Sequence, residues 1–117
     1  MEEIKSLEIL FLIDYLKRVI GSRIEKVKEI SKNCFSLKLY KKDLKKKYLI
    51  VSDKFIFLTD KNFKGDKLSK LGQILRSKFT NQIIEDLRQH EFERIVEIET
   101  RNFLLILELF DKGNLIL

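Results

Sequence analysis

Hydrophobic residues recur with helical spacing in two stretches of this chain. In residues 7–20 they return every three or four positions, with Ser6 as a candidate N-cap and Gly21 as a candidate C-terminal stop. In residues 68–79 leucines and a phenylalanine form one face, and basic residues form much of the rest. Gly72 lies inside this second stretch, where glycine costs up to ~1 kcal/mol relative to alanine, so it suggests close packing. These patterns predict two helices.

The remaining pattern is typical of β-strands, because hydrophobic and β-branched residues alternate with polar ones between short turn segments. The order helix, four strands, helix, four strands predicts an α+β fold, in which two helices accompany an antiparallel β-sandwich or half-barrel. At 117 residues the chain is long enough for a single domain over residues 1–117. The predicted strands are residues 23–30, 34–40, 48–52, 55–59, 82–89, 92–100, 103–110 and 115–117.

One charged residue does not fit the alternation of the predicted strand 92–100. Successive side chains of an extended strand point to opposite faces, which places Arg94 on the more apolar side with Val96 and Ile98. An unpaired charge buried there would cost several kcal/mol, roughly, so Arg94 needs a carboxylate, a carbonyl cluster or an opening to water. Arg94 is therefore the best candidate for a binding site.

Basic residues are concentrated in the middle of the chain. Residues 38–78 contain thirteen Lys or Arg and four Asp, a balance of +9, whereas the whole chain carries +6 and the remainder −3. This separation favours a polyanionic partner, with phosphate as the leading candidate, although lysine also keeps a fold soluble. Five lysines fall in residues 41–47, the expected tip of a hairpin. There they could bind phosphates, or solvate a loop and block edge pairing.

The sequence offers none of the common catalytic or metal-binding motifs. One cysteine, Cys34, and one histidine, His90, are too few for the usual zinc sites, and we expect Cys34 to be a small buried hydrophobe. There is no glycine-rich phosphate loop and no nucleophile beside a base, so we expect no enzyme, cofactor or metal site. No apolar run reaches about eighteen residues and the N-terminal segment is acidic. We therefore expect a cytoplasmic protein without membrane contact.

Five segments, in this order, resemble motifs of the N-terminal NFACT domain of ribosome-associated quality-control factors, a family also described as NEMF-like or fibronectin-binding-protein-like. Residues 6–9 (SLEI) resemble its opening small–Leu–Asp–aliphatic motif. Residues 21–27 (GSRIEKV) and 75–78 (LRSK) are similar to its Gly-x-Arg-Ile-x-Lys step and its Leu-Arg-Lys segment. Residues 89–96 (QHEFERIV) and 108–117 (ELFDKGNLIL) resemble its Asp-Arg-Ile-Val stretch and its closing hairpin. The resemblance covers nearly the whole chain.

This resemblance implies a fold similar to the N-terminal domain of formamidopyrimidine-type DNA glycosylases. It also implies a role on the large ribosomal subunit, where the family senses stalled peptidyl-tRNA and recruits tRNA for nascent-chain tailing. The family's functional acid and its Asp-Arg pair correspond to Glu8, Glu93 and Arg94, with Glu at both positions where the family has Asp. The family continues through further domains, including a coiled coil, so this chain corresponds to a truncated or split form.

These observations predict an RNA-binding domain of a ribosome quality-control factor, with tRNA and the large ribosomal subunit as partners. The alternative is a protein-interaction module whose last strand pairs with a separately encoded remainder of the factor. A glycosylase-like enzyme is a weaker third hypothesis. The predicted nucleic-acid-binding residues are Glu8, Glu93, Arg94, Lys41, Lys42, Lys45, Lys46, Lys47, Lys70 and Arg76.

Overall fold

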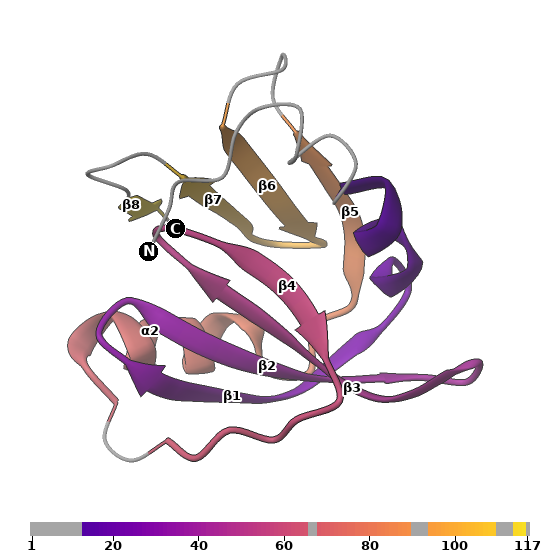
Figure 1. Cartoon of the computed structure of the whole chain (residues 1–117), viewed down its shortest axis with the longest axis horizontal. Helices are drawn as coiled ribbons and strands as arrows, with labels where there is room; N and C mark the ends of the chain where they lie inside the picture. Colours follow the sequence, from indigo (N-terminus) through magenta and orange to yellow (C-terminus); the bar gives the residue numbers. More distant parts are fainter. Residues whose placement is uncertain (1–12, 66–67, 90–93, 110–113, 117) are drawn as a thin grey trace.

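The computed structural model describes residues 13–65, 68–89, 94–109 and 114–116, and arranges them as two antiparallel sheets with helical segments beside them (Figure 1). Sheet A contains, in spatial order, β1 (Arg23–Ser31), β2 (Cys34–Lys41), β3 (Leu44–Ser52) and β4 (Ile56–Thr59). Sheet B contains β5 (Ile84–Gln89), β6 (Ile95–Thr100), β7 (Leu104–Glu108) and β8 (Asn114–Ile116). Residues 13–16 form an α-helical turn that continues into the 3-10 helix η1 (Lys17–Val19), and α2 (Lys70–Phe79) connects the two sheets. The predicted α+β architecture and order of elements are confirmed.

The two sheets are joined at one corner, where β1 meets the start of β5. An antiparallel bridge connects Arg23 and Ile83. Gly21 N donates to Ile84 O at 2.7 Å, and Ile84 N donates to Ser22 O at 2.9 Å. Gly21 has a φ of +93°, which suits the residue predicted to end the first helical segment.

Hydrophobic side chains from both sheets and both helical segments form a shared core. Each strand turns alternate residues inward, so a continuous apolar layer is buried between the sheets. The core residues are Ile13, Leu16, Val19, Ile24, Val27, Phe35, Leu37, Leu39, Leu49, Val51, Ile56, Leu75, Phe79, Ile84, Leu87, Val96, Ile98, Leu105, Leu107 and Leu109.

A buried carboxylate of β1 seats the N-terminus of α2. Glu29 is 8% exposed, and its Oε1 accepts a hydrogen bond from Ser69 N at 2.6 Å. Ser69 is the N-cap of the helix, and its Oγ accepts from Gly72 N at 3.1 Å. A Cβ at Gly72 would lie 2.5 Å from Glu29 Oε1, so the close packing predicted at this glycine is confirmed.

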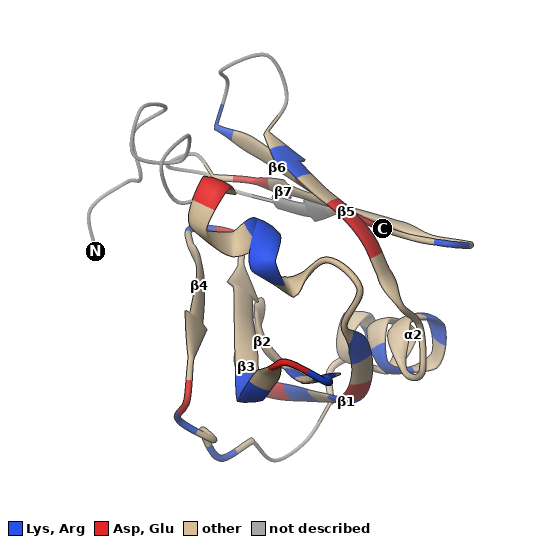
Figure 2. Ribbon diagram, turned by 90° about the vertical axis from the view of Figure 1, so that its right-hand side faces the viewer, with Lys and Arg blue, Asp and Glu red and all other residues tan. Residues whose placement is uncertain are grey.

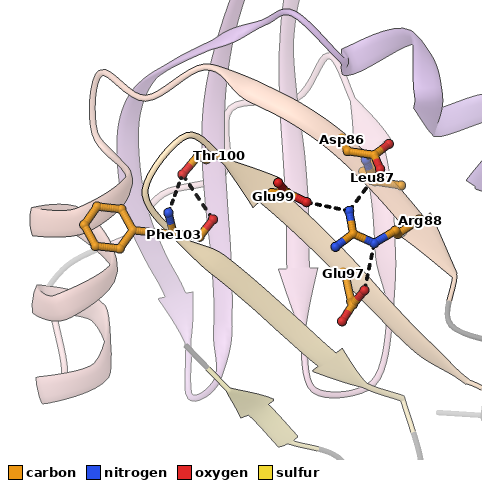
Figure 3. A network of polar contacts seen from close by, with 7 residues as sticks. All are labelled: Asp86, Leu87, Arg88, Glu97, Glu99, Thr100 and Phe103. Atoms are coloured by element: carbon orange, nitrogen blue, oxygen red, sulfur yellow. Dashed lines mark hydrogen bonds and ion pairs between the residues drawn. The ribbon is translucent and has the colours of Figure 1, made fainter.

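Tight turns set the register of both sheets. Asn33, with a φ of 54°, closes the β1–β2 hairpin in the left-handed region that asparagine tolerates. In sheet B the buried Thr100 hydroxyl accepts from Phe103 N at 3.2 Å and closes the β6–β7 turn (Figure 3). The first turn places Lys26 opposite Lys38 and Lys28 opposite Ser36.

Two local predictions differ from the structure. The hairpin predicted at residues 41–47 is present, but its strands are longer than expected, because β2 extends to Lys41 and β3 begins at Leu44, which leaves residues 42–43 as the turn. Lysine side chains do not prevent strand pairing, since their charged ends reach water while the backbone continues the ladder. Arg94 lies at a bend before β6, whose ladder begins at Ile95; the expected inward alternation then holds for the buried Val96 and Ile98.

Among the described residues, no helix combines the length and the apolar character needed to cross a membrane.

Candidate nucleic-acid interface

The two sheets carry opposite net charges. Residues 23–59, which span sheet A, contain eleven Lys or Arg and four Asp or Glu, a balance of +7. The described residues between 84 and 109, which form most of sheet B, contain three Arg and five Asp or Glu, a balance of −2. Figure 2 shows blue segments grouped where β1 and β3 run, and a red segment on β5. A polyanion is therefore attracted to sheet A and repelled by sheet B.

Two of the predicted hairpin lysines are held by the protein itself. Lys41 Nζ donates to Ile20 O at 2.8 Å and to Arg18 O at 3.1 Å. A cation there balances the carbonyl groups at the end of the first helical segment. Lys47 forms an ion pair with Asp60. These contacts occupy two of the three donors of Lys41 Nζ and one of the three of Lys47 Nζ, so both ammonium groups are partly committed within the protein.

Three other hairpin lysines are exposed and make no hydrogen bond or ion pair with the described part of the chain. Lys42 lies in the turn, and Lys45 and Lys46 follow on β3. Consecutive strand residues point to opposite faces, so Lys45 and Lys46 place positive charge on both sides of the hairpin. The tip projects away from the body of the molecule (Figure 1) and is open to a large partner.

The predicted basic residues of α2 lie far from the hairpin tip. Lys70 is exposed and follows Ser69, which contacts Glu29 on β1. Arg23 lies at the end of β1 nearer the hairpin tip, and Glu29 lies six residues farther along the strand. Six strand residues separate the two positions by about 20 Å. Arg76 contacts β1, where its Nη2 donates a hydrogen bond to Val27 O at 3.5 Å. The structure therefore separates the predicted lysines and Arg76 into two groups rather than one patch.

The predicted acid–arginine site can be described in part. Glu8 and Glu93 lie outside the described residues. Arg94 is partly buried, and its carbonyl accepts a hydrogen bond from Leu109 N at 2.8 Å. This hydrogen bond links the residue before β6 to Leu109, the residue that follows β7.

The acidic face of sheet B is organised around Arg88, which the sequence analysis did not select (Figure 3). Arg88 Nη1 donates to Glu99 Oε1 at 2.7 Å and to Asp86 Oδ2 at 2.9 Å, and Nε donates to Glu97 Oε1 at 2.8 Å. The hydrogen bond to Glu99, followed by those to Asp86 and Glu97, raises the pKa of Arg88 above its ordinary value. Three carboxylates around one guanidinium leave this cluster net negative and unsuited to phosphate.

The outer face of sheet A contains a cavity that the sequence analysis also missed. Its volume is about 90 Å³. The signal was present in the alternation of β2, where Ser36 and Lys38 share the outward face, but the opposing residues of β1 depend on the hairpin register. The cavity is lined by Lys26, Lys28, Ser36, Lys38, Lys46, Tyr48 and Asn62.

Two exposed tyrosines lie beside arginines near the hairpin end of sheet A. Arg18 Cζ is 4.6 Å from the centroid of the Tyr15 ring, and Arg23 Cζ is 5.5 Å from that of Tyr40. Such pairs offer an aromatic face together with a cation, which suits stacking on an unpaired base.

Comparison with known families matches residues 10–117 to the family described as NFACT N-terminal and middle domains. This chain belongs to the NFACT family. A search of curated proteins finds no match to this NFACT sequence.

Solved structures show the same fold for this NFACT domain. The N-terminal domain of the fibronectin-binding protein PavA from Streptococcus pneumoniae has a TM-score of 0.85 at 21% identity, covering 97% of this chain and 48% of that one. The N-terminal part of the fibronectin/fibrinogen-binding protein from Streptococcus suis has a TM-score of 0.86, with the same identity and coverage. The fibrinogen-binding protein from Staphylococcus aureus has a TM-score of 0.77 at 18% identity, covering 96% of this chain and 45% of that one. This NFACT chain spans about half the length of these structures.

Proposed function

We propose that this NFACT domain binds RNA as part of a ribosome quality-control factor, contacting backbone phosphates of tRNA and of the large ribosomal subunit. The observation that carries the proposal is the charge separation, with +7 in the span of sheet A and −2 in the described part of sheet B. Nonspecific RNA affinity comes mainly from neutralising phosphates. The proposed role is binding and not catalysis. Because translating ribosomes are the proposed partner, the proposed location is the cytoplasm.

Within this interface the exposed hairpin lysines make the first phosphate contacts. Lys42, Lys45 and Lys46 combine exposure with the absence of a partner in the described part of the chain. Lys70 extends the basic surface at the other end of sheet A. The Arg–Tyr pairs beside the hairpin would stack on unpaired bases, and Arg94 would contact a phosphate.

The test is the salt dependence of tRNA affinity, measured by fluorescence polarisation between 50 and 300 mM NaCl, roughly the range over which such contacts weaken strongly. We expect log Kd to rise linearly with log salt. A variant with Lys42, Lys45 and Lys46 changed to Gln should reduce the magnitude of the slope by about 2 to 3. The matched control changes Lys32, Lys54 and Lys64, which are exposed elsewhere, and should reduce it less. A flat salt dependence, or equal losses in both variants, would contradict the proposal.

Arg94 is tested separately because its environment differs from that of the lysines. Arg94→Ala should weaken tRNA binding while circular dichroism shows that the protein remains folded. Unchanged affinity in the folded variant would remove Arg94 from the interface and leave the lysine-based proposal in place.

A second candidate function is pairing with another polypeptide through sheet B. β8 is the last strand in the order β5-β6-β7-β8, and within the described residues it pairs with β7 alone. A free strand edge can accept a further strand by backbone hydrogen bonding. Gel filtration with a candidate partner separates the two functions, because a complex that forms without RNA and survives 1 M salt, roughly three times the highest concentration above, favours strand pairing.

A further inference from the structure

Four lysines line the small cavity on the outer face of sheet A. The register places Lys26 directly opposite Lys38 on the neighbouring strand, and like charges in that position destabilise a sheet. Lys28 lines the cavity from β1 and Lys46 from β3. No carboxylate from the described part of the chain lines the cavity. The repulsion is relieved when an anion occupies the space between these side chains.

One polar group without a partner, the hydroxyl of Ser36, is part of the lining. Ser36 is 1% exposed, and its Oγ has no hydrogen-bond partner among the described residues. A buried hydroxyl in this state costs free energy, which a ligand oxygen at the cavity would recover. Lys28 Nζ donates to Asn62 Oδ1 at 2.6 Å, which fixes one ammonium group at the rim. Tyr48, 3% exposed and opposite Lys38, forms part of the wall.

We infer that this cavity is a binding site for one phosphate group and that, if the proposed function holds, the group belongs to an RNA backbone. The volume of about 90 Å³ accommodates several water molecules, and therefore one tetrahedral oxyanion. An ammonium group has three donors, of which Lys28 uses one on Asn62, and the Ser36 hydroxyl offers one more. This number of donors matches the several acceptor oxygens of a phosphate better than the two of a carboxylate. The contacts involve no base edge, so the site is indifferent to RNA sequence.

Inorganic phosphate tests the site directly, without RNA. The ¹⁵N-labelled protein is titrated with sodium phosphate, against sodium chloride at matched ionic strength, and backbone amide shifts are followed by NMR. We expect saturable shifts that are confined to residues lining the cavity, such as Lys28, Ser36, Lys38 and Tyr48. Shifts that grow linearly without saturation, or that appear equally at lysines across the surface, would overturn the inference.

Three single substitutions locate the binding energy. Lys38→Gln and Lys26→Gln should each weaken phosphate binding by about tenfold, as expected for loss of one charge-assisted hydrogen bond. Lys26 is exposed, so its variant should fold even if the more central Lys38→Gln does not. Lys32→Gln makes the same charge change in the β1–β2 turn and should alter the Kd by less than about twofold. Equal effects of Lys26→Gln and Lys32→Gln would show a general charge effect and overturn the site.

A parallel titration with tRNA separates this inference from the proposed function. If tRNA binds with the expected salt dependence but phosphate does not saturate, the cavity is not the contact and the proposed function stands. If phosphate saturates but tRNA does not bind, the anion site stands and both the RNA assignment and the proposed function are wrong. If both bind, Lys26→Gln should weaken tRNA binding more than Lys32→Gln does.

Discussion

Replacing Gly72 with alanine tests how sheet A positions α2 and its basic residues. A Cβ at this position would lie 2.5 Å from Glu29 Oε1 and 3.2 Å from Phe35 Cε1. The carboxylate must therefore move, and it loses the 2.6 Å hydrogen bond from Ser69 N. Loss of a hydrogen bond to a charged group costs about 1.5–3 kcal/mol, whereas the higher helix propensity of alanine returns up to ~1 kcal/mol. We expect Gly72→Ala to lower the free energy of unfolding by about 1–2 kcal/mol.

Urea unfolding followed by circular dichroism measures this change, and a double-mutant cycle isolates its cause. In a Glu29→Ala background the conflicting oxygen is absent, so Gly72→Ala should be neutral or stabilising by up to ~1 kcal/mol. The reasoning is refuted if Gly72→Ala stabilises the wild-type protein. It is also refuted if the alanine is equally destabilising in both backgrounds, because the strain would then come from a residue other than Glu29.

Three further predictions concern single contacts. Lys41→Met should lower the free energy of unfolding in urea by about 1 kcal/mol, because two backbone carbonyls lose their donor, whereas Lys42→Met should change it by less than about 0.5 kcal/mol. Arg88→Gln should lower the Tm at low salt, because three carboxylates lose their ion pairs with the guanidinium. The loss should be smaller in 1 M NaCl, roughly the concentration at which charges more than about 3 Å apart are screened. A decrease in Tm that does not depend on salt would contradict the ionic origin of this stabilisation. Burial raises the pKa of the Cys34 thiol, so iodoacetamide should modify the native protein more slowly than the unfolded one at pH 8, roughly the ordinary thiol range. Because its pKa is raised, the Cys34 thiol holds its proton more tightly in the folded state than in the unfolded state. The resulting contribution to the free energy of unfolding is complete below the unfolded pKa and is lost as pH rises through the folded pKa.

The fold was predictable because its signals are local. Strand alternation and helical spacing depend on neighbouring residues, and they gave the correct order of elements. Gly21 and Gly72 were informative because glycine is rarely neutral in a helix or at its end: one adopts a positive φ, and the other meets a buried carboxylate. Cys34 is buried, as expected for a small hydrophobe.

The interface was less predictable because it depends on which strands pair and in what register. The composition identified the lysine-rich segment, but not that Lys41 binds carbonyls of the first helical segment or that Lys47 pairs with Asp60. The cavity lysines come from three strands, and only the ladder brings Lys26 and Lys38 together. Arg94 was predicted to lie inside the strand, but it lies at a bend one residue before β6, and a local bend of this kind leaves no mark in the alternation.

Opposite charge on the two sheets gives the molecule an electric dipole moment. In the electric field of any surface rich in phosphate groups, this dipole produces a torque that turns sheet A toward that surface before contact. Encounters then occur in one preferred orientation, and collisions through the wrong face become rarer. Sheet B, with Arg88 and its three carboxylates, then faces away from the phosphates. Its outer strand β8 pairs with β7 alone among the described residues, so this side of the molecule stays accessible to a protein while sheet A is occupied.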